Sequence, residues 1–172
     1  MEDNLKHILS RRSIRKYTDQ PVELEKITKL LKCAMSAPSA CNQQPWHFII
    51  IENADAKQKI SEIHSGFSMV KDAPVAILVC CDTENAQLEL YCRLDCSAAT
   101  ENILIAANTL GLGALWLGIN PDGGEDSDIL RKVLDIPEKI YPFSLIPVGY
   151  PAETKEPADR FNIDKIHYNS NW

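Results

Sequence analysis

Residues 11–17, with the sequence RRSIRKY, are the first stretch of the chain whose side chains suggest a chemical role. In an extended conformation side chains alternate between two faces, so Arg11, Ser13 and Arg15 are expected on one face. Guanidinium groups bind phosphate or carboxylate oxygens through paired hydrogen bonds, which makes this face a candidate anion site. A basic turn after a helix C-terminus, which the helix dipole favours, explains the same residues equally well. The opposite face would carry Arg12, Ile14 and Lys16.

A polar loop is expected over residues 37–46, APSACNQQPW, between a helix that Pro38 stops and a strand whose entry Pro45 fixes. Its hydroxyl and amide side chains carry donors and acceptors suited to the edge of a heteroaromatic ring. A polar surface turn is the alternative, and Cys41 gives a third, thiol-based interpretation. The polar side chains are those of Ser39, Asn42, Gln43 and Gln44.

Motifs of several common enzyme classes do not occur in the sequence. There is no P-loop, no G-x-S-x-G nucleophile motif and no C-x-x-C pair. Gly111, Gly113 and Gly118 have the wrong spacing for a dinucleotide-binding fingerprint and follow a helix where the fingerprint needs a strand. Cys92 and Cys96 would share a helix face, where small packing residues are favoured over a two-thiolate metal site. No metal site is therefore expected.

The 172 residues carry a formal net charge of -6, with 18 Lys and Arg against 24 Asp and Glu. This length suits a single domain with its own core. Residues 1–32 hold eight basic and five acidic side chains, a net of +3 on an otherwise acidic protein. The acidic balance argues against a nucleic-acid partner. With no apolar run of about 18 residues and no signal sequence, we expect a cytoplasmic protein that does not span a membrane.

Hydrophobic periodicity predicts the elements that position these residues. The strand at 73–82 is expected to be buried on both faces. Small residues late in the segment 84–110 permit close approach of other backbones, so this helix is central or lies at a subunit interface. Helices are expected over residues 4–10, 23–35, 55–63, 84–110 and 127–134, and strands over 46–51, 73–82, 114–117 and 143–150.

The remaining segments are the ends of these elements and the tail. Gly111 and Gly113 are expected to end the long helix in left-handed conformations. A turn is expected at residues 121–124. The order of elements indicates one α/β domain, and residues 151–172 form an extended arm that must dock on something to be ordered.

Four motifs occur in a fixed order: R-R-S-x-R, A-P-S-x-x-N-x-Q-P-W, G-L-G-x-x-W-x-G and G-Y-P followed by a late Arg. Together they resemble the nitroreductase family of FMN-dependent oxidoreductases, over nearly the whole chain from residue 4 to residue 172. The resemblance implies an α+β fold of three α/β/α layers, with a mostly antiparallel sheet flanked by helices. It also implies an intertwined homodimer with two FMN molecules at the interface. Residues 1–172 would form one domain, with 151–172 as an arm docked on the partner subunit.

The resemblance also assigns site residues, position by position. The N-terminal motif would contact the FMN phosphate, the ribityl chain and the pyrimidine end of the ring. The polar loop would reach the FMN held by the other subunit, a short segment would bring its backbone near flavin N5, and the late Arg would bind phosphate. These residues are Arg11, Arg12, Ser13 and Arg15; Pro38, Ser39, Asn42 and Gln44; Leu117 and Gly118; and Arg160.

One position departs from the family pattern. Many members have a second basic residue two positions before the late Arg, where this chain has Ala158. Either Lys155 replaces that residue, or the phosphate rests on Arg11 and Arg160. The region between residues 51 and 73 is also short, so the resemblance does not specify the substrate pocket or its lid.

In the family's chemistry, NAD(P)H would give hydride to flavin N5, and a small acceptor such as a nitroaromatic or quinone would then take its place in a ping-pong cycle. No side-chain acid or base is required; Arg15 and Gly118 would tune the flavin. Three alternatives remain: flavin binding without turnover, flavin-based dehalogenation or flavin fragmentation, and a thiol-based role through Cys41.

Overall fold

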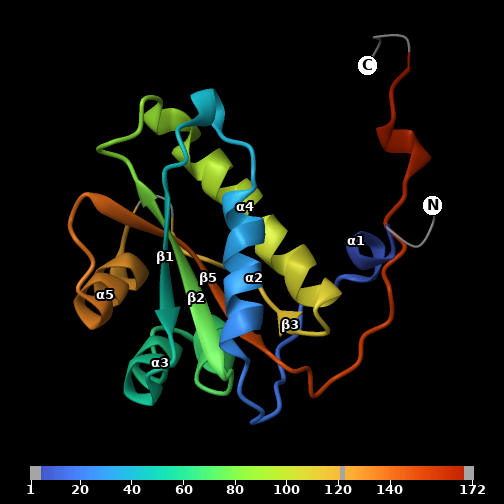
Figure 1. Ribbon diagram of the computed structural model, residues 1–172, viewed down its shortest axis with the longest axis horizontal. Coiled ribbons are helices and arrows are strands. Elements are labelled where there is room, and N and C mark those ends of the chain that lie inside the picture. The colour runs from blue at the N-terminus through green and yellow to red at the C-terminus, as the bar shows by residue number, and fades with distance from the viewer. Residues whose placement is uncertain (1–4, 121–122, 169–172) are drawn as a thin grey trace.

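An antiparallel sheet organises the chain, which this computed structural model describes over residues 5–120 and 123–168 (Figure 1). The long strands β1 (Trp46–Ile51), β2 (Val75–Asp82) and β5 (Ile140–Gly149) lie side by side in that order. The short strands β3 (Gly113–Ala114) and β4 (Leu117–Gly118) both pair with the far edge of β5. The predicted antiparallel sheet is thus confirmed, and β1 has its predicted bounds.

Strand β2 divides the core into two layers. All eight of its residues are buried, which confirms the prediction of burial on both faces. Because side chains alternate across a strand, Val75, Ile77, Val79 and Cys81 join one hydrophobic cluster, and Ala76, Leu78 and Cys80 join the other.

Helices cover both faces of the sheet (Figure 1). On one face lie α2 (Leu24–Met35) and α4 (Cys92–Thr109), which form the first cluster with the sheet. On the other lie α3 (Ala54–Ser61), α5 (Glu125–Leu134) and the 3-10 helix Ser65–Val70. The three layers match the predicted fold class. None of the helices in the described ranges is long and apolar enough to cross a membrane.

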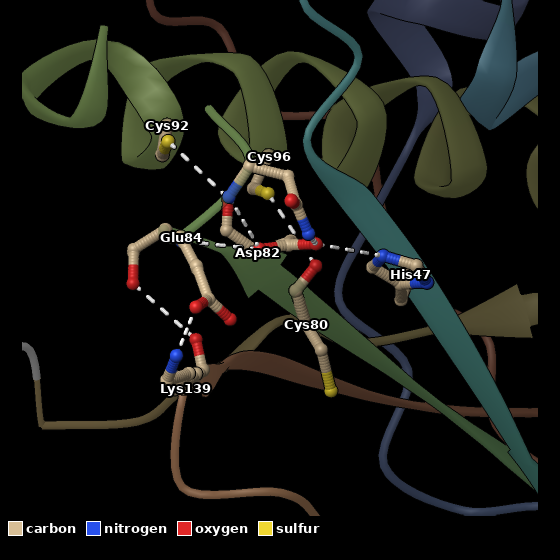
Figure 2. Close-up of polar contacts among 9 residues, drawn as sticks. His47, Cys80, Asp82, Glu84, Cys92, Cys96 and Lys139 are labelled. Atoms are coloured by element: carbon tan, nitrogen blue, oxygen red, sulfur yellow. Dashed lines mark hydrogen bonds and ion pairs between the residues drawn. The ribbon is translucent and has the colours of Figure 1, made fainter. Parts of the chain in front are cut away.

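The long helix begins later than predicted. Residues 84–91 are bends followed by the 3-10 helix Glu89–Tyr91, and α4 starts only at Cys92. The cause is Asp82 at the end of β2: its carboxylate accepts hydrogen bonds from the backbone N–H of Glu84 and Asn85 and from the Asn85 side chain, which closes a turn. The same hydrogen bonds, led by the Asn85 amide, lower the pKa of Asp82. Figure 2 shows this turn beside the buried thiols of Cys92 and Cys96.

The segment after α4 corrects two further predictions. The strand expected at 114–117 is two separate two-residue strands, with Leu115 and Trp116 between them. Gly111 ends α4 with a φ of 73°, as predicted, whereas Gly113 lies in β3 without a positive φ. Gly113 is instead needed because the side chain of Ile14 packs against its Cα. The start of the predicted first helix and the first half of the 121–124 turn lie outside the described residues.

Replacing Gly113 by alanine is expected to lower the free energy of unfolding by about 1–3 kcal/mol, the usual cost of overpacking. A Cβ there would lie 2.7 Å from Ile14 Cγ2, so the segment that carries the arginines would have to shift. Gly118→Ala is the matched control, since apart from its two chain neighbours no described residue has a heavy atom within 4 Å of the added Cβ. Urea unfolding without added cofactor measures both. Equal stability of the two variants would contradict the expected close packing.

Candidate functional site

The arginine segment, residues 11–17, is fixed to the sheet by two buried side chains, Ile14 and Tyr17. The Ile14 N–H donates to Ala114 O at 3.0 Å, and the Tyr17 hydroxyl donates to Ile14 O at 2.6 Å and lies 3.2 Å from Pro147 O. Burial raises the pKa of Tyr17. Isolated bridges at Ser13 and Tyr17 are the strand-like pairings of this segment.

The expected division of this segment into two faces is wrong. Its buried anchors, Ile14 and Tyr17, are three residues apart and pack in one cluster, so strict alternation of side chains does not hold between them. As a result Arg11 and Arg12 line the same hollows, and Arg15 and Lys16 line one cavity together. Arg12, which alternation alone placed on the opposite face from Arg11, lies beside it, in agreement with the site that the family resemblance implies.

Three predicted site residues, Arg11, Arg12 and Arg160, meet in one hollow of about 230 Å³ between α1 (Lys6–Ser10) and the C-terminal arm. Arg12 Nη1 is buried and has no hydrogen-bond partner among the described residues. Arg11 Nε pairs with Glu101 Oε1 at 3.3 Å. A buried donor without an acceptor is costly, and a phosphate beside three guanidinium groups would satisfy it. The residues present thus fit a phosphate-bearing ligand.

Lys155 has a different role from the missing basic residue at position 158. It lines the adjoining hollow, but its Nζ donates to Ser13 O at 2.6 Å and pairs with Glu153 Oε1 at 3.3 Å. The Glu153 carboxylate also accepts the Arg15 N–H at 2.6 Å, the contact that contributes most to lowering the pKa of Glu153. Lys155 and Glu153 therefore hold the backbone of the arginine segment, which favours the arginines as the anion ligands.

The polar loop folds tightly against α4. Cys41, Asn42 and Gln44 have positive φ values of 50°, 54° and 48°, which turn the chain sharply between its two prolines. The Gln44 N–H donates to Ser39 Oγ at 3.1 Å, and Gln44 Nε2 donates to Asn42 Oδ1 at 2.9 Å. Pro38, Asn42 and Gln44 are exposed at the surface. The loop thus presents amide groups to solvent in a fixed arrangement.

Asp95 on α4, which sequence reasoning missed, holds this loop. Its side chain belongs to a residue that is only 5% exposed, and its two oxygens accept the Ala40 N–H at 2.9 Å and Gln43 Nε2 at 2.6 Å. Gln43 in turn exchanges hydrogen bonds with the backbone of Leu88. The available signal was an aspartate within the apolar face of a helix, where a buried carboxylate needs partners.

Most of the predicted site residues form two clusters in one chain, and Leu117 and Gly118 lie apart from both. The loop contacts α4 at Asp95, whereas the arginine segment follows α1, whose backbone and Ser10 hydroxyl accept hydrogen bonds from Asn108. These α4 positions are about 20 Å apart along the helix axis. Figure 1 shows the loop at one end of α4 and α1 with the C-terminal arm at the other. Leu117 and Gly118 lie on the edge strand β4, where Gly118 is exposed.

The fold has three layers, and its arginine cluster contains a buried donor without a partner among the described residues. Comparison with protein families identifies the class of protein to which this combination belongs. The Nitroreductase family model matches residues 8–91 and 64–150, and the chain belongs to that family. The sequence resemblance to this family is therefore confirmed.

Individual relatives cover nearly the full chain. A Methanothermobacter thermautotrophicus protein named "Putative NADH dehydrogenase/NAD(P)H nitroreductase" is 49% identical over 165 residues, which are 96% of this chain and 86% of that protein. A crystal structure of the same name from Parabacteroides distasonis has a TM-score of 0.92 at 42% identity, with 99% of each chain covered. An FMN-dependent nitroreductase from Clostridium difficile has a TM-score of 0.88 at 31% identity, covering 97% of this chain and 99% of that one.

Proposed function

We propose that this protein is an NAD(P)H-dependent oxidoreductase that binds FMN and acts as a homodimer. The observation that carries the proposal is the buried, unpartnered Arg12 Nη1 beside Arg11 and Arg160. Guanidinium groups bind phosphate well, and three of them line this hollow against one carboxylate, that of Asp159. The FMN-dependent relative from Clostridium difficile supports FMN as the source of that phosphate.

When bound, FMN supplies the hydride chemistry by accepting two electrons from a donor and passing them to an acceptor. The protein's residues hold and tune it. Arg11, Arg12 and Arg160 bind the phosphate, and Ser13 binds the ribityl chain. Arg15 would place a positive charge at the pyrimidine end of the ring, where it would favour reduction of the bound flavin. The backbone of Leu117 and Gly118 would hold the reactive edge of the ring.

The second subunit supplies the rest of the site. The loop residues Pro38, Ser39, Asn42 and Gln44 contact the flavin that the partner's arginines hold, because within one chain they lie at the other end of α4. The exposed apolar side chains of α1 and the arm fit a buried interface; Leu9 is 70% exposed and Phe161 76%. The arm, residues 151–172, docks on the partner; its last four residues lie outside the described chain.

The reaction is a ping-pong transfer of hydride. NAD(P)H and a small organic acceptor, such as a nitroaromatic or a quinone, take turns at one open face of the ring. Gly118 is exposed, and apart from its chain neighbours no described residue lies within 4 Å of an added Cβ, which leaves that edge accessible. No side chain is assigned as acid or base, since solvent supplies the protons.

Anaerobic spectroscopy tests this function. The purified protein is expected to be yellow and to release FMN on denaturation. Adding NADH or NADPH without oxygen should bleach the flavin absorbance, and a quinone or nitroaromatic should then restore it. Protein that neither contains nor binds FMN would refute the proposal. Bound FMN that no nicotinamide reduces would instead identify a flavin-binding protein without this turnover.

A further inference from the structure

A second basic site lies beside the arginine segment. It is a cavity of about 560 Å³, within the size range of small-molecule sites, between that segment, α3 and the turn that precedes β2. Its lining carries four cations against two carboxylates, a local excess of positive charge on an acidic protein. The cations are Arg15, Lys16, Lys57 and Lys71, and the carboxylates are Asp19 and Asp72.

These cations have no ion-pair partner among the described residues, although the charge of Glu52 acts on Lys57, where burial lowers the pKa and Glu52 raises it by less. Across residues 5–120 and 123–168, none of the four forms an ion pair, although Asp19 and Asp72 line the same cavity. Lys57 is only 8% exposed, and its Nζ donates to Ala73 O at 2.6 Å and Pro74 O at 3.0 Å. An ammonium has three N–H donors, so one remains for a ligand. Lys57 is thus a fixed cation, whereas Lys16 and Lys71 are exposed and can adjust to a bound anion.

We propose that this cavity binds the phosphate groups of the nicotinamide dinucleotide that reduces the flavin. The inference rests on the proposed function, because Arg15 belongs both to this cavity and to the pyrimidine end of the flavin site. An anion held here therefore lies next to the ring. The FMN phosphate is assigned to Arg11, Arg12 and Arg160, and nitroaromatic and quinone acceptors carry no fixed charge. The dinucleotide is the reactant with a diphosphate left to place.

Donors with and without phosphate test the assignment on the FMN-loaded enzyme. Lys71→Gln and Lys16→Gln are each expected to lower kcat/KM for NADH and NADPH by about tenfold, the usual effect of losing one charge-assisted contact. N-benzyl-1,4-dihydronicotinamide, which has no phosphate, should reduce every variant at the wild-type rate. Lys132→Gln, the same charge change on α5 away from the cavity, is the control and should alter neither donor. Equal losses with both donors, or no loss with either, would overturn the assignment.

A binding measurement gives a readout independent of turnover. Inorganic pyrophosphate, titrated calorimetrically into FMN-loaded protein, should bind wild type and bind Lys71→Gln about tenfold more weakly. It should also compete with NADH and not with the phosphate-free donor. Absence of pyrophosphate binding, or binding that does not compete with NADH, would refute the donor site. If no donor reduces the bound flavin, the proposed function itself fails.

Discussion

Replacing Arg12 by methionine is expected to weaken FMN binding by about 100-fold without destabilising the FMN-free protein. In the FMN-free protein the buried Nη1 has no acceptor among the described residues, so its removal takes away an unpaired polar atom. The free energy of unfolding should therefore stay unchanged or rise by up to about 1 kcal/mol. With FMN bound, the same atom would donate to the phosphate, and its loss removes a charge-assisted hydrogen bond.

Fluorescence titration of FMN and urea unfolding of the apoprotein measure the two quantities. Lys6→Met, the same change of charge at an exposed position of α1, is the matched control and should affect neither. A variant that loses stability without FMN, yet binds FMN as wild type does, would show that Arg12 has a structural role and does not bind the cofactor.

Asp95→Asn is expected to lower the free energy of unfolding by about 2 kcal/mol and FMN affinity by more than about tenfold. An asparagine amide has one acceptor oxygen and one donor nitrogen, so it cannot serve both the Ala40 N–H and the Gln43 amide. One buried donor is left unsatisfied, and the loop loses its fixed shape. Asp95 is not itself a proposed flavin ligand, and its hydrogen bonds go to Ala40 and Gln43 of the loop. It therefore acts as a positioning residue.

A positioning role predicts more than lost stability. The flavin absorbance spectrum should shift even in FMN-saturated Asp95→Asn, because the amides at the ring have moved. Asp128→Asn, on the exposed face of α5, provides the control. Mixing Arg12→Met with Asp95→Asn subunits should restore about a quarter of the sites, since each mixed dimer has one site free of both changes. No recovery after verified subunit exchange would contradict the shared site.

Much of the fold followed from hydrophobic patterning. The buried run that forms β2 and the amphipathic α2 are unambiguous, because each buries a continuous apolar surface. The prediction of a helix was wrong for the residues between Asp82 and Cys92. Their composition is compatible with a helix and does not reveal that the Asp82 side chain closes a turn there. The start of strand β3 at Gly113 was missed because a glycine after a helix predicts a helix cap. In the structure, Gly113 is required by the close packing of the Ile14 side chain.

The candidate site was predictable where it lies in continuous motifs. The arginine segment and the polar loop were singled out from the residues and Arg160 from the family resemblance, and the structure places Arg11, Arg12 and Arg160 around one hollow. Features assembled from distant segments were not. Asp95 is separated by more than 50 positions from the loop that it holds, and the cavity at Lys57 and Lys71 draws on three parts of the chain.

The placement of the two clusters at opposite ends of α4 has a consequence for the protein in the cell. In the proposed dimer, every cofactor molecule is held by both subunits, so cofactor binding and subunit association are linked by mass action. Dilution alone would release flavin, even without any substitution in the binding site. By reciprocity, flavin supply would strengthen the pairing of subunits to the same degree. The fraction of active protein then depends on how abundant the protein is, and a modest fall in expression would reduce activity more than in proportion.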